Sequence, residues 1–269
     1  TIGLNSTVTF EEVAYMPDFQ TENGIGWAGH YDRIENTNWG PRFDGVVRPV
    51  GPSFPEGYPV SDQMLAYSPI QDNVKDFFQT GVTSTNTLSV SGGDESSTFY
   101  MSYGRQNTTG IVPDDEYERN TFRINATKKI GKMSLSVNSS YFQDRTDVVG
   151  DQIGDQDRPL YWFLLNTPAN IPLTTYKDYN NIASYGHSDN YYNAYYQNPY
   201  WAVGTNRDQD RTTRLNATMA ASYDILSNLN FTARMSVNSA AGDGKNIRDR
   251  QEYDADLQGA HSTVSSFVE

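Results

Sequence analysis

The chain has 269 residues, and its 33 acidic and 20 basic side chains give a formal net charge of −13 at pH 7. Nucleic-acid-binding domains are usually basic, so this balance excludes nucleic acid as a partner. Because cysteine is absent, disulfides, thiolate metal sites and cysteine nucleophiles are excluded too. A mean hydropathy of −0.67 argues against a helix of about 20 apolar residues that could span a membrane. The alternating strands of a membrane β-barrel are compatible with that value.

Seven segments alternate apolar and polar residues with a period of two, which predicts β-strands with one apolar and one polar face. Their apolar positions fall within 2–10, 88–90, 99–103, 122–126, 133–141, 215–223 and 229–237. The opposite positions carry Ser, Thr, Asn and Arg, as at Thr121, Arg123 and Arg214. Residues 263–268 read as the start of another strand, so we expect the chain to be a piece of a longer protein.

Long and short connections alternate between these strands. The long ones are 16–83 and 145–210, a medium one is 106–118, and tight turns are expected at 92–95, 130–132 and 226–228. An up-and-down barrel places all long connections at one end, as outer-membrane barrels do. Seven strands cannot close such a barrel, so the sequence predicts an arc of a larger wall. Two aromatic girdles are expected at the strand ends: Phe10, Phe122 and Tyr141 at the outer end, and Phe99, Tyr223 and Phe231 at the other.

Several short motifs occur in an order that is similar to that of one known family. They are Asn38-Trp39-Gly40-Pro41-Arg42-Phe43-Asp44-Gly45, Tyr67-Ser68-Pro69, the segments 73–81, 88–93, 98–100, 110–113 and 117–123, and Asn198-Pro199-Tyr200-Trp201. Together they cover most of the chain. In this set the chain resembles the SusC/RagA-like TonB-dependent transporters of Bacteroidetes outer membranes.

The resemblance implies an all-β fold in which residues 1–269 form seven to eight strands of a 22-stranded antiparallel transmembrane barrel with long extracellular loops. It implies the outer membrane of a Gram-negative bacterium, with the lipid bilayer around the barrel. It also implies import of oligosaccharides or, less often, peptides beneath a SusD-like surface lipoprotein that acts as a lid. Energy would come from the TonB complex through a plug and a TonB box that this sequence does not contain. No cofactor is implied.

Five residues in the long loops are candidate ligand contacts: Trp39, Arg42, Asp44, Tyr200 and Trp201. Aromatic rings stack on sugar faces, and Arg or Asp bonds hydroxyl or peptide groups through charge-assisted hydrogen bonds. The loop 145–210 also holds nine of the 19 tyrosines, which suits a ligand or partner surface. The alternative is that these residues anchor the long loops, which need a core of their own to stay ordered.

The sequence gives little support to a metal site or a catalytic site. Four carboxylates lie close together in the sequence as a weak calcium candidate, although their spacing is not that of an EF-hand: Asp147, Asp151, Asp155 and Asp157. A solvated acidic loop explains them without a metal and is the preferred interpretation. We find no catalytic constellation, so we expect no enzyme, and a barrel enzyme is the weakest hypothesis. The main alternative to a transporter is a secreted or surface all-β module that binds carbohydrate, such as an adhesin.

Overall fold

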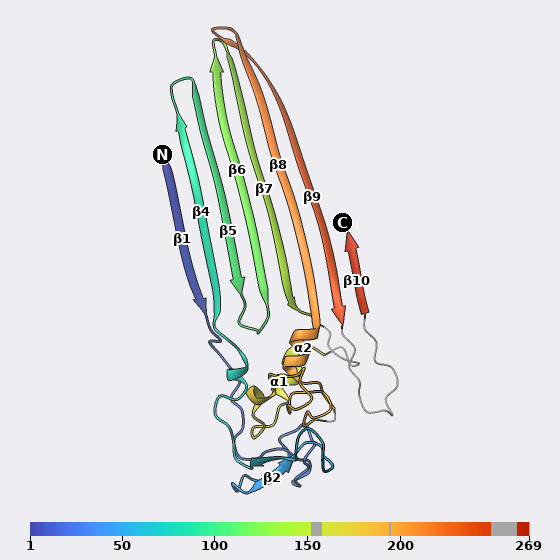
Figure 1. Cartoon of the computed structure of the whole chain (residues 1–269). Helices are drawn as coiled ribbons and strands as arrows, with labels where there is room; N and C mark the ends of the chain where they lie inside the picture. The colour runs from blue at the N-terminus through green and yellow to red at the C-terminus, as the bar shows by residue number, and fades with distance from the viewer. Residues whose placement is uncertain (152–157, 194, 249–262, 269) are drawn as a thin grey trace.

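The computed structural model describes residues 1–151, 158–193, 195–248 and, as backbone only, 263–268. Eight strands form one antiparallel sheet in the order β1-β4-β5-β6-β7-β8-β9-β10 (Figure 1). Their bounds are β1 Ile2–Glu11, β4 Gly81–Gly93, β5 Ser97–Thr109, β6 Glu116–Ile130, β7 Met133–Val149, β8 Asn206–Leu226, β9 Leu229–Arg248 and β10 Thr263–Val268. The fold is therefore the predicted all-β barrel arc, and the strand expected at 263–268 is present.

The connections alternate in space as the sequence predicted. The tight turns lie together at one end of the sheet and the long connections at the other (Figure 1). β6 and β7 are joined by two residues, and Gly131 adopts a φ of 58° there. Two-residue hairpin turns require such left-handed conformations, which glycine adopts without steric cost.

The strand register places the apolar strand residues on one side of the sheet. Directly paired residues of neighbouring antiparallel strands point to the same side. One such row crosses six strands and consists of Leu4, Leu88, Tyr103, Phe122, Tyr141 and Leu215. We call this side the apolar face and the opposite side the polar face. Large side chains on the apolar face are widely exposed, including Met219, Phe231 and Met235.

The apolar face has two sharp limits. Toward the long connections, the next row on the same side is entirely polar: Ser6, Asn86, Arg105, Asn120, Gln143 and Thr213. Toward the tight turns, the last row joins Ile130, Met133, Tyr223 and Phe231. From Tyr141 to Met133 the strand runs about 26 Å at about 3.3 Å per residue. Outer-membrane barrels carry an apolar band of about 25 Å, which this height approaches before strand tilt is allowed for.

Four of the six girdle residues lie where the sequence predicted. Phe122 and Tyr141 are paired in the row nearest the long connections, and Tyr223 and Phe231 are paired in the row nearest the turns. Phe10 differs, because it pairs with Val82 beyond the polar row, where β1 continues past the apolar band. Phe99 also differs, since it pairs with Ala126, two rows inside the turn end.

The strands extend further toward the loops than the sequence pattern indicated. β7 continues to Val149 and β8 begins at Asn206, so the long connection spans 150–205 rather than 145–210. The other long connection spans 12–80 rather than 16–83. The β8 extension is polar on both faces and the β7 extension ends in the adjacent valines Val148 and Val149, so the period-two signal disappears there. Among the described residues, no helix is long and apolar enough to cross a membrane.

The described parts of the two long connections pack together into one unit at the end of the sheet, which we call the loop body (Figure 1). It contains the two-stranded sheet of β2 (Val47–Val50) and β3 (Gln63–Ala66), the 3₁₀ turns η1 (Lys75–Phe77) and η2 (Leu173–Tyr176), and the helices α1 (Leu160–Leu165) and α2 (Pro199–Thr205). One buried cluster combines Val74, Phe77, Leu160, Phe163, Leu164, Leu173, Tyr200, Ala202 and Val203. A second combines Ile25, Val50, Tyr67, Ile171, Tyr176, Tyr191 and Tyr192.

Candidate functional site

The loop body contains a groove of about 790 Å³ that is lined by the exposed ring of Trp39. The groove is walled mainly by segments 19–23 and 36–40, and Leu165 and Asn166 at the end of α1 complete it. A smaller cavity of about 340 Å³ adjoins it and shares Phe19, Gln20, Thr21 and Asn38 with it. We call the larger space the Trp39 groove.

Two glycine-rich segments cross beneath Trp39 and hold it in place. Gly40 N–H donates to the carbonyl oxygen of Gly24 at 3.1 Å, and Gly29 N–H donates to that of Trp39 at 2.8 Å. A Cβ on Gly40 would lie 2.2 Å from the carbonyl oxygen of Ile25, so only glycine fits. The indole is therefore presented from a tightly packed backbone while 68% of its surface remains exposed.

The buried side chain of Tyr67 bonds both of these glycine-rich segments. Its hydroxyl lies 2.9 Å from the Pro41 carbonyl oxygen and accepts from Gly24 N–H at 3.2 Å. Burial raises the pKa of Tyr67, so the hydroxyl keeps its proton for donation at neutral pH. Preorganisation of this kind lowers the entropy that a binding site loses when it captures a ligand.

Side-chain amides supply the polar part of the groove. Asn38 Oδ1 accepts from Ala169 N–H at 2.7 Å, and Asn166 Nδ2 donates to the Trp162 carbonyl oxygen at 2.7 Å. In the described part of the chain, the second polar atom of each of these two amides has no hydrogen-bond partner. An aromatic ring beside directed amide donors and acceptors is a surface that fits sugar hydroxyls or peptide groups.

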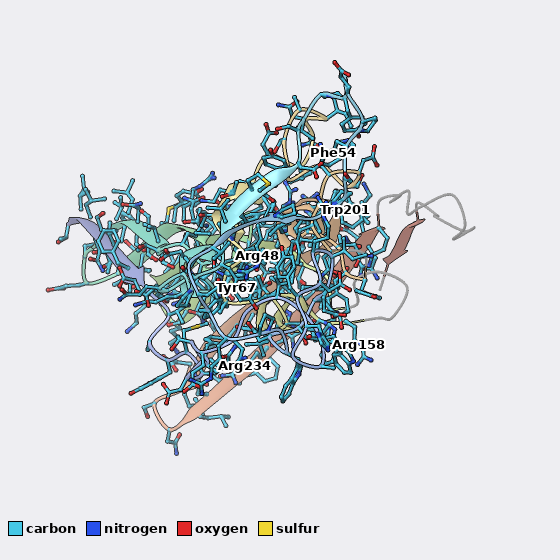
Figure 2. The ribbon with its side chains drawn as sticks, turned by 90° about the horizontal axis from the view of Figure 1, so that it is seen from below. Arg48, Phe54, Tyr67, Arg158, Trp201 and Arg234 are labelled. Carbon is cyan, nitrogen blue, oxygen red and sulfur yellow. The ribbon has the colours of Figure 1, made fainter. Side chains whose placement is uncertain are left out.

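Arg42 lies at the edge of this groove. Its guanidinium is 2.8 Å from the carboxylate of Glu22, a groove residue, and both side chains are mostly exposed. Asp44 lies outside the groove lining and bonds Arg48 through both carboxylate oxygens at 2.6 Å. This bond lowers the pKa of Asp44 to about 2. Arg48 in turn stacks over the Tyr67 ring at 4.7 Å, and the two lie together in Figure 2.

Tyr200 and Trp201 lie in a different part of the loop body, in helix α2. The Tyr200 ring is buried, 4.7 Å from the ring of Phe77, and leaves no face for a ligand. Half-buried Trp201 packs against the same cluster, and Figure 2 shows it apart from Arg48 and Tyr67. Asn198 caps the helix by accepting from Tyr200 N–H at 3.0 Å, with Pro199 at the first helical position. The Asn-Pro-Tyr-Trp motif is therefore a helix start.

Asp147 takes part in an ion-pair network. Its carboxylate is 2.8 Å from Arg207 Nε and accepts from Gln209 Nε2 at 2.7 Å. Arg207 also lies 3.1 Å from Asp115, whose pKa is raised by burial. Of the other calcium candidates, Asp151 is exposed, and Asp155 and Asp157 lie outside the described residues. Among the described residues, no three acidic, histidine or cysteine side chains are placed to hold a metal.

The structure thus brings together only part of the predicted site. Trp39 lines the groove and Arg42 borders it, whereas Asp44, Tyr200 and Trp201 stabilise the loop body. Sequence reasoning missed Phe19, Asn23, Asn38 and Asn166, which also line the groove. Asn38 could have been predicted, because it is the first residue of the motif that contains Trp39. Asn166 could not have been predicted, since nothing in the sequence around it indicates that it lies near Trp39.

Comparison with known proteins identifies a structural relative. No family model matches the sequence, and no curated protein matches it. Among solved structures, the chain is similar to a chain in the structure of the RagAB peptide importer in the "closed-closed" state, with a TM-score of 0.58 and 15% identity. The alignment covers 94% of this chain and 29% of that one, so this chain spans less than a third of the length of its relative. At this identity the similarity concerns the fold.

Proposed function

We propose that this chain forms part of the wall of an outer-membrane importer for peptides or oligosaccharides. The observation that carries the proposal is the band of apolar rows on one face of the sheet, bounded by a polar row toward the loops. In the described part of the chain, the only other sheet is β2–β3 in the loop body, so no second layer covers this band. Lipid is the natural partner of such a face, and the polar face then lines an aqueous lumen.

The fold similarity to a peptide importer supports the same proposal. In the proposed arrangement of this protein, the long connections face outward beneath a surface lipoprotein lid. Energy comes from the TonB complex through segments outside this chain. The role is transport and not catalysis. A soluble adhesin, the rival hypothesis, would need its apolar band buried by protein, which disfavours it.

The Trp39 groove is the proposed ligand contact in the loops. Binding there predicts that Trp39→Ala in the full-length protein weakens ligand binding at least tenfold, since aromatic hot spots contribute about 2 kcal/mol or more. Trp27→Ala is the matched control, because Trp27 is similarly exposed in the same loops but does not line the groove.

The test measures surface abundance, lid association and binding of a peptide and an oligosaccharide panel for both variants. Normal abundance and lid association with binding lost only in Trp39→Ala supports the groove. Equal binding by both variants would reduce Trp39 to a structural role. Failure of cells with the intact transporter to take up any of the ligands would count against import itself.

A further inference from the structure

Two arginines on the polar face stack on one aromatic ring, and a third arginine lies nearby on the same face. Phe142 in β7 is directly paired with Arg214 in β8 and with Thr121 in β6. Arg119 and Arg123 lie two residues to either side of Thr121, so all three guanidinium groups share one face with the ring. The Cζ atoms of Arg119 and Arg214 lie 4.8 Å and 5.6 Å from the Phe142 ring centroid. We call this group the Phe142 arginine cluster.

The cluster has more positive charge than its surroundings neutralise. In the described part of the chain, none of its three arginines has a carboxylate within ion-pair distance, and Arg119 Nε is buried without a hydrogen-bond partner. Asp144 is the acidic residue paired with Arg119, and it lies 3.5 Å from the Tyr117 hydroxyl, which also contacts Arg119. Asp210 lies one row further toward the loops.

Arginines on the apolar-face side of the same strands behave differently. Arg105 has Glu118 at 3.3 Å, Arg145 has Asp147 at 3.6 Å, and Arg207 has Asp147 at 2.8 Å. These three arginines are paired, whereas in the described part of the chain neither Arg211 nor any arginine of the cluster has a carboxylate within ion-pair distance. Stacking on Phe142 engages the guanidinium planes of Arg119 and Arg214, and a stacked guanidinium can still donate hydrogen bonds from its N–H edges.

We infer that the Phe142 arginine cluster is a binding site for the carboxylates of a transported ligand, either an acidic peptide or a uronic-acid oligosaccharide. This inference rests on the proposed function, because the polar face must line the transport path. The planar guanidinium fork suits bidentate bonding to carboxylate. Arg119 and Arg123 are about 13 Å apart along β6, which equals the span of four residues in an extended peptide. Asn216 and Thr121 on the same face add neutral donors and acceptors between the cations.

The test uses the full-length protein in detergent and a blocked peptide with glutamate at positions one and five, Ac-Glu-Gly-Gly-Gly-Glu-NH₂. Its glutamine counterpart is the neutral probe, and trigalacturonic acid against maltotriose repeats the comparison for sugars. We expect the acidic member of at least one pair to bind tenfold or more tightly than the neutral one, since a hydrogen bond to a charged group contributes about a tenfold to hundredfold factor. A preference within the peptide pair indicates a peptide ligand, and a preference within the sugar pair indicates an oligosaccharide.

Two variants localise the effect. The double change Arg119→Gln with Arg214→Gln should abolish the preference for the acidic probe and leave binding of the neutral one unchanged. Arg211→Gln, which removes a positive charge from the opposite side of β8, should preserve the preference. Equal binding of acidic and neutral probes by the unaltered protein overturns the inference without any variant. Loss of the preference in Arg211→Gln overturns it too, because the effect would then be one of overall charge.

The cluster could also pair with a carboxylate from another part of the same protein instead of a ligand. In that case the unaltered protein shows no preference, and the double variant unfolds at a lower temperature, which also overturns the inference. Uptake of a neutral peptide by cells is the readout that separates the two proposals. If uptake persists while the acidic preference is absent, the cluster hypothesis fails and the importer hypothesis stands.

Discussion

Gly40 shows how one missing side chain positions the groove. Gly40→Ala would place a methyl group 2.2 Å from the Ile25 carbonyl oxygen and 2.6 Å from the Tyr67 hydroxyl, so the crossing beneath Trp39 must open. We expect a destabilisation of about 1–3 kcal/mol, as for other overpacked sites. Thermal unfolding of the full-length protein measures it. Gly242→Ala is the control, since its nearest atom would be 3.7 Å away, and a similar loss in both variants would refute the explanation.

Arg207 holds two carboxylates that burial would otherwise penalise. Asp115 and Asp147 have side chains only 18% and 19% exposed. Arg207→Met leaves Asp115 without its cation and leaves Asp147 with only Arg145 at 3.6 Å, and breaking such a buried pair costs about 3–5 kcal/mol. Arg105→Met is the matched control, because its pair with Glu118 is about half exposed and surface pairs contribute about 1 kcal/mol or less. Comparable unfolding temperatures for the two variants would contradict this ranking.

The ion pair between Asp44 and Arg48 has a defined pH range. The pKa of Asp44 falls from its usual 3.8 to about 2 in the folded protein, because the Arg48 guanidinium and the Val46 N–H bond the charged form. A lowered folded-state pKa stabilises the fold above the unfolded value, and this stabilisation disappears as pH falls. The difference in unfolding temperature between the unaltered protein and Asp44→Asn should thus be constant above about pH 5 and shrink toward pH 2. A difference that disappears above pH 5 would be inconsistent with this pair.

At the scale of the strand, adjacent residues face opposite sides of the sheet and should therefore differ in whether they tolerate a charged substitution. Ala217 is on the apolar face, paired with Ser139 and Val237, one row inside the aromatic end of the band, whereas Thr218 is on the polar face. Arginine in the middle of a lipid-facing band costs about 2–4 kcal/mol and less toward the ends of the band, so the cost at Ala217 falls below that range. Ala217→Arg should therefore reduce the amount of folded barrel in the membrane, and Thr218→Arg should not. Folded barrel is measured by its heat-dependent migration on gels, and equal loss in both variants would argue against lipid contact.

Strand pairing was predictable because each strand carries its own signal. The apolar residues of β6 and β7 occupy one parity, and the short turn at Gly131 fixes their register, so the pairing of Phe122 with Tyr141 follows from local sequence. The loop-side ends of β7 and β8 were not predicted, because the alternation of apolar and polar residues stops there.

The loop body has no comparable local signal. Ile25 N–H donates to Asn170 Oδ1 at 2.8 Å across 145 residues of sequence, and no period or motif announces such a contact. For this reason the motifs identified Trp39 and Arg42 but not the amides around them. The same reasoning misjudged Tyr200, since a capped helix and a ligand site place similar residues side by side.

For the whole molecule, the sheet places the loop body and the tight turns at opposite ends. If the proposal is correct, the loop body is outside and the turns lie on the periplasmic side. A single cysteine introduced at exposed Ala183 in the full-length protein should react with a membrane-impermeant thiol reagent on intact cells, whereas one at exposed Lys132 should not. The 269 residues contain no cysteine of their own to interfere. Labelling at Lys132 alone would invert the topology and refute the orientation.

The merging of two long connections into one loop body also has a kinetic consequence. The bonds from Ile25 to Asn170 and from Ala169 to Asn38 each close more than 130 residues of chain, so the loop-closure entropy is large unless the strands between them are already paired. Once β4 to β8 are in register, the ends of both connections lie at one edge of the sheet and the closure becomes short. The Trp39 groove should consequently be among the last parts to acquire protease resistance during assembly. In the proposed importer, an incompletely inserted barrel would then lack a finished groove at the cell exterior.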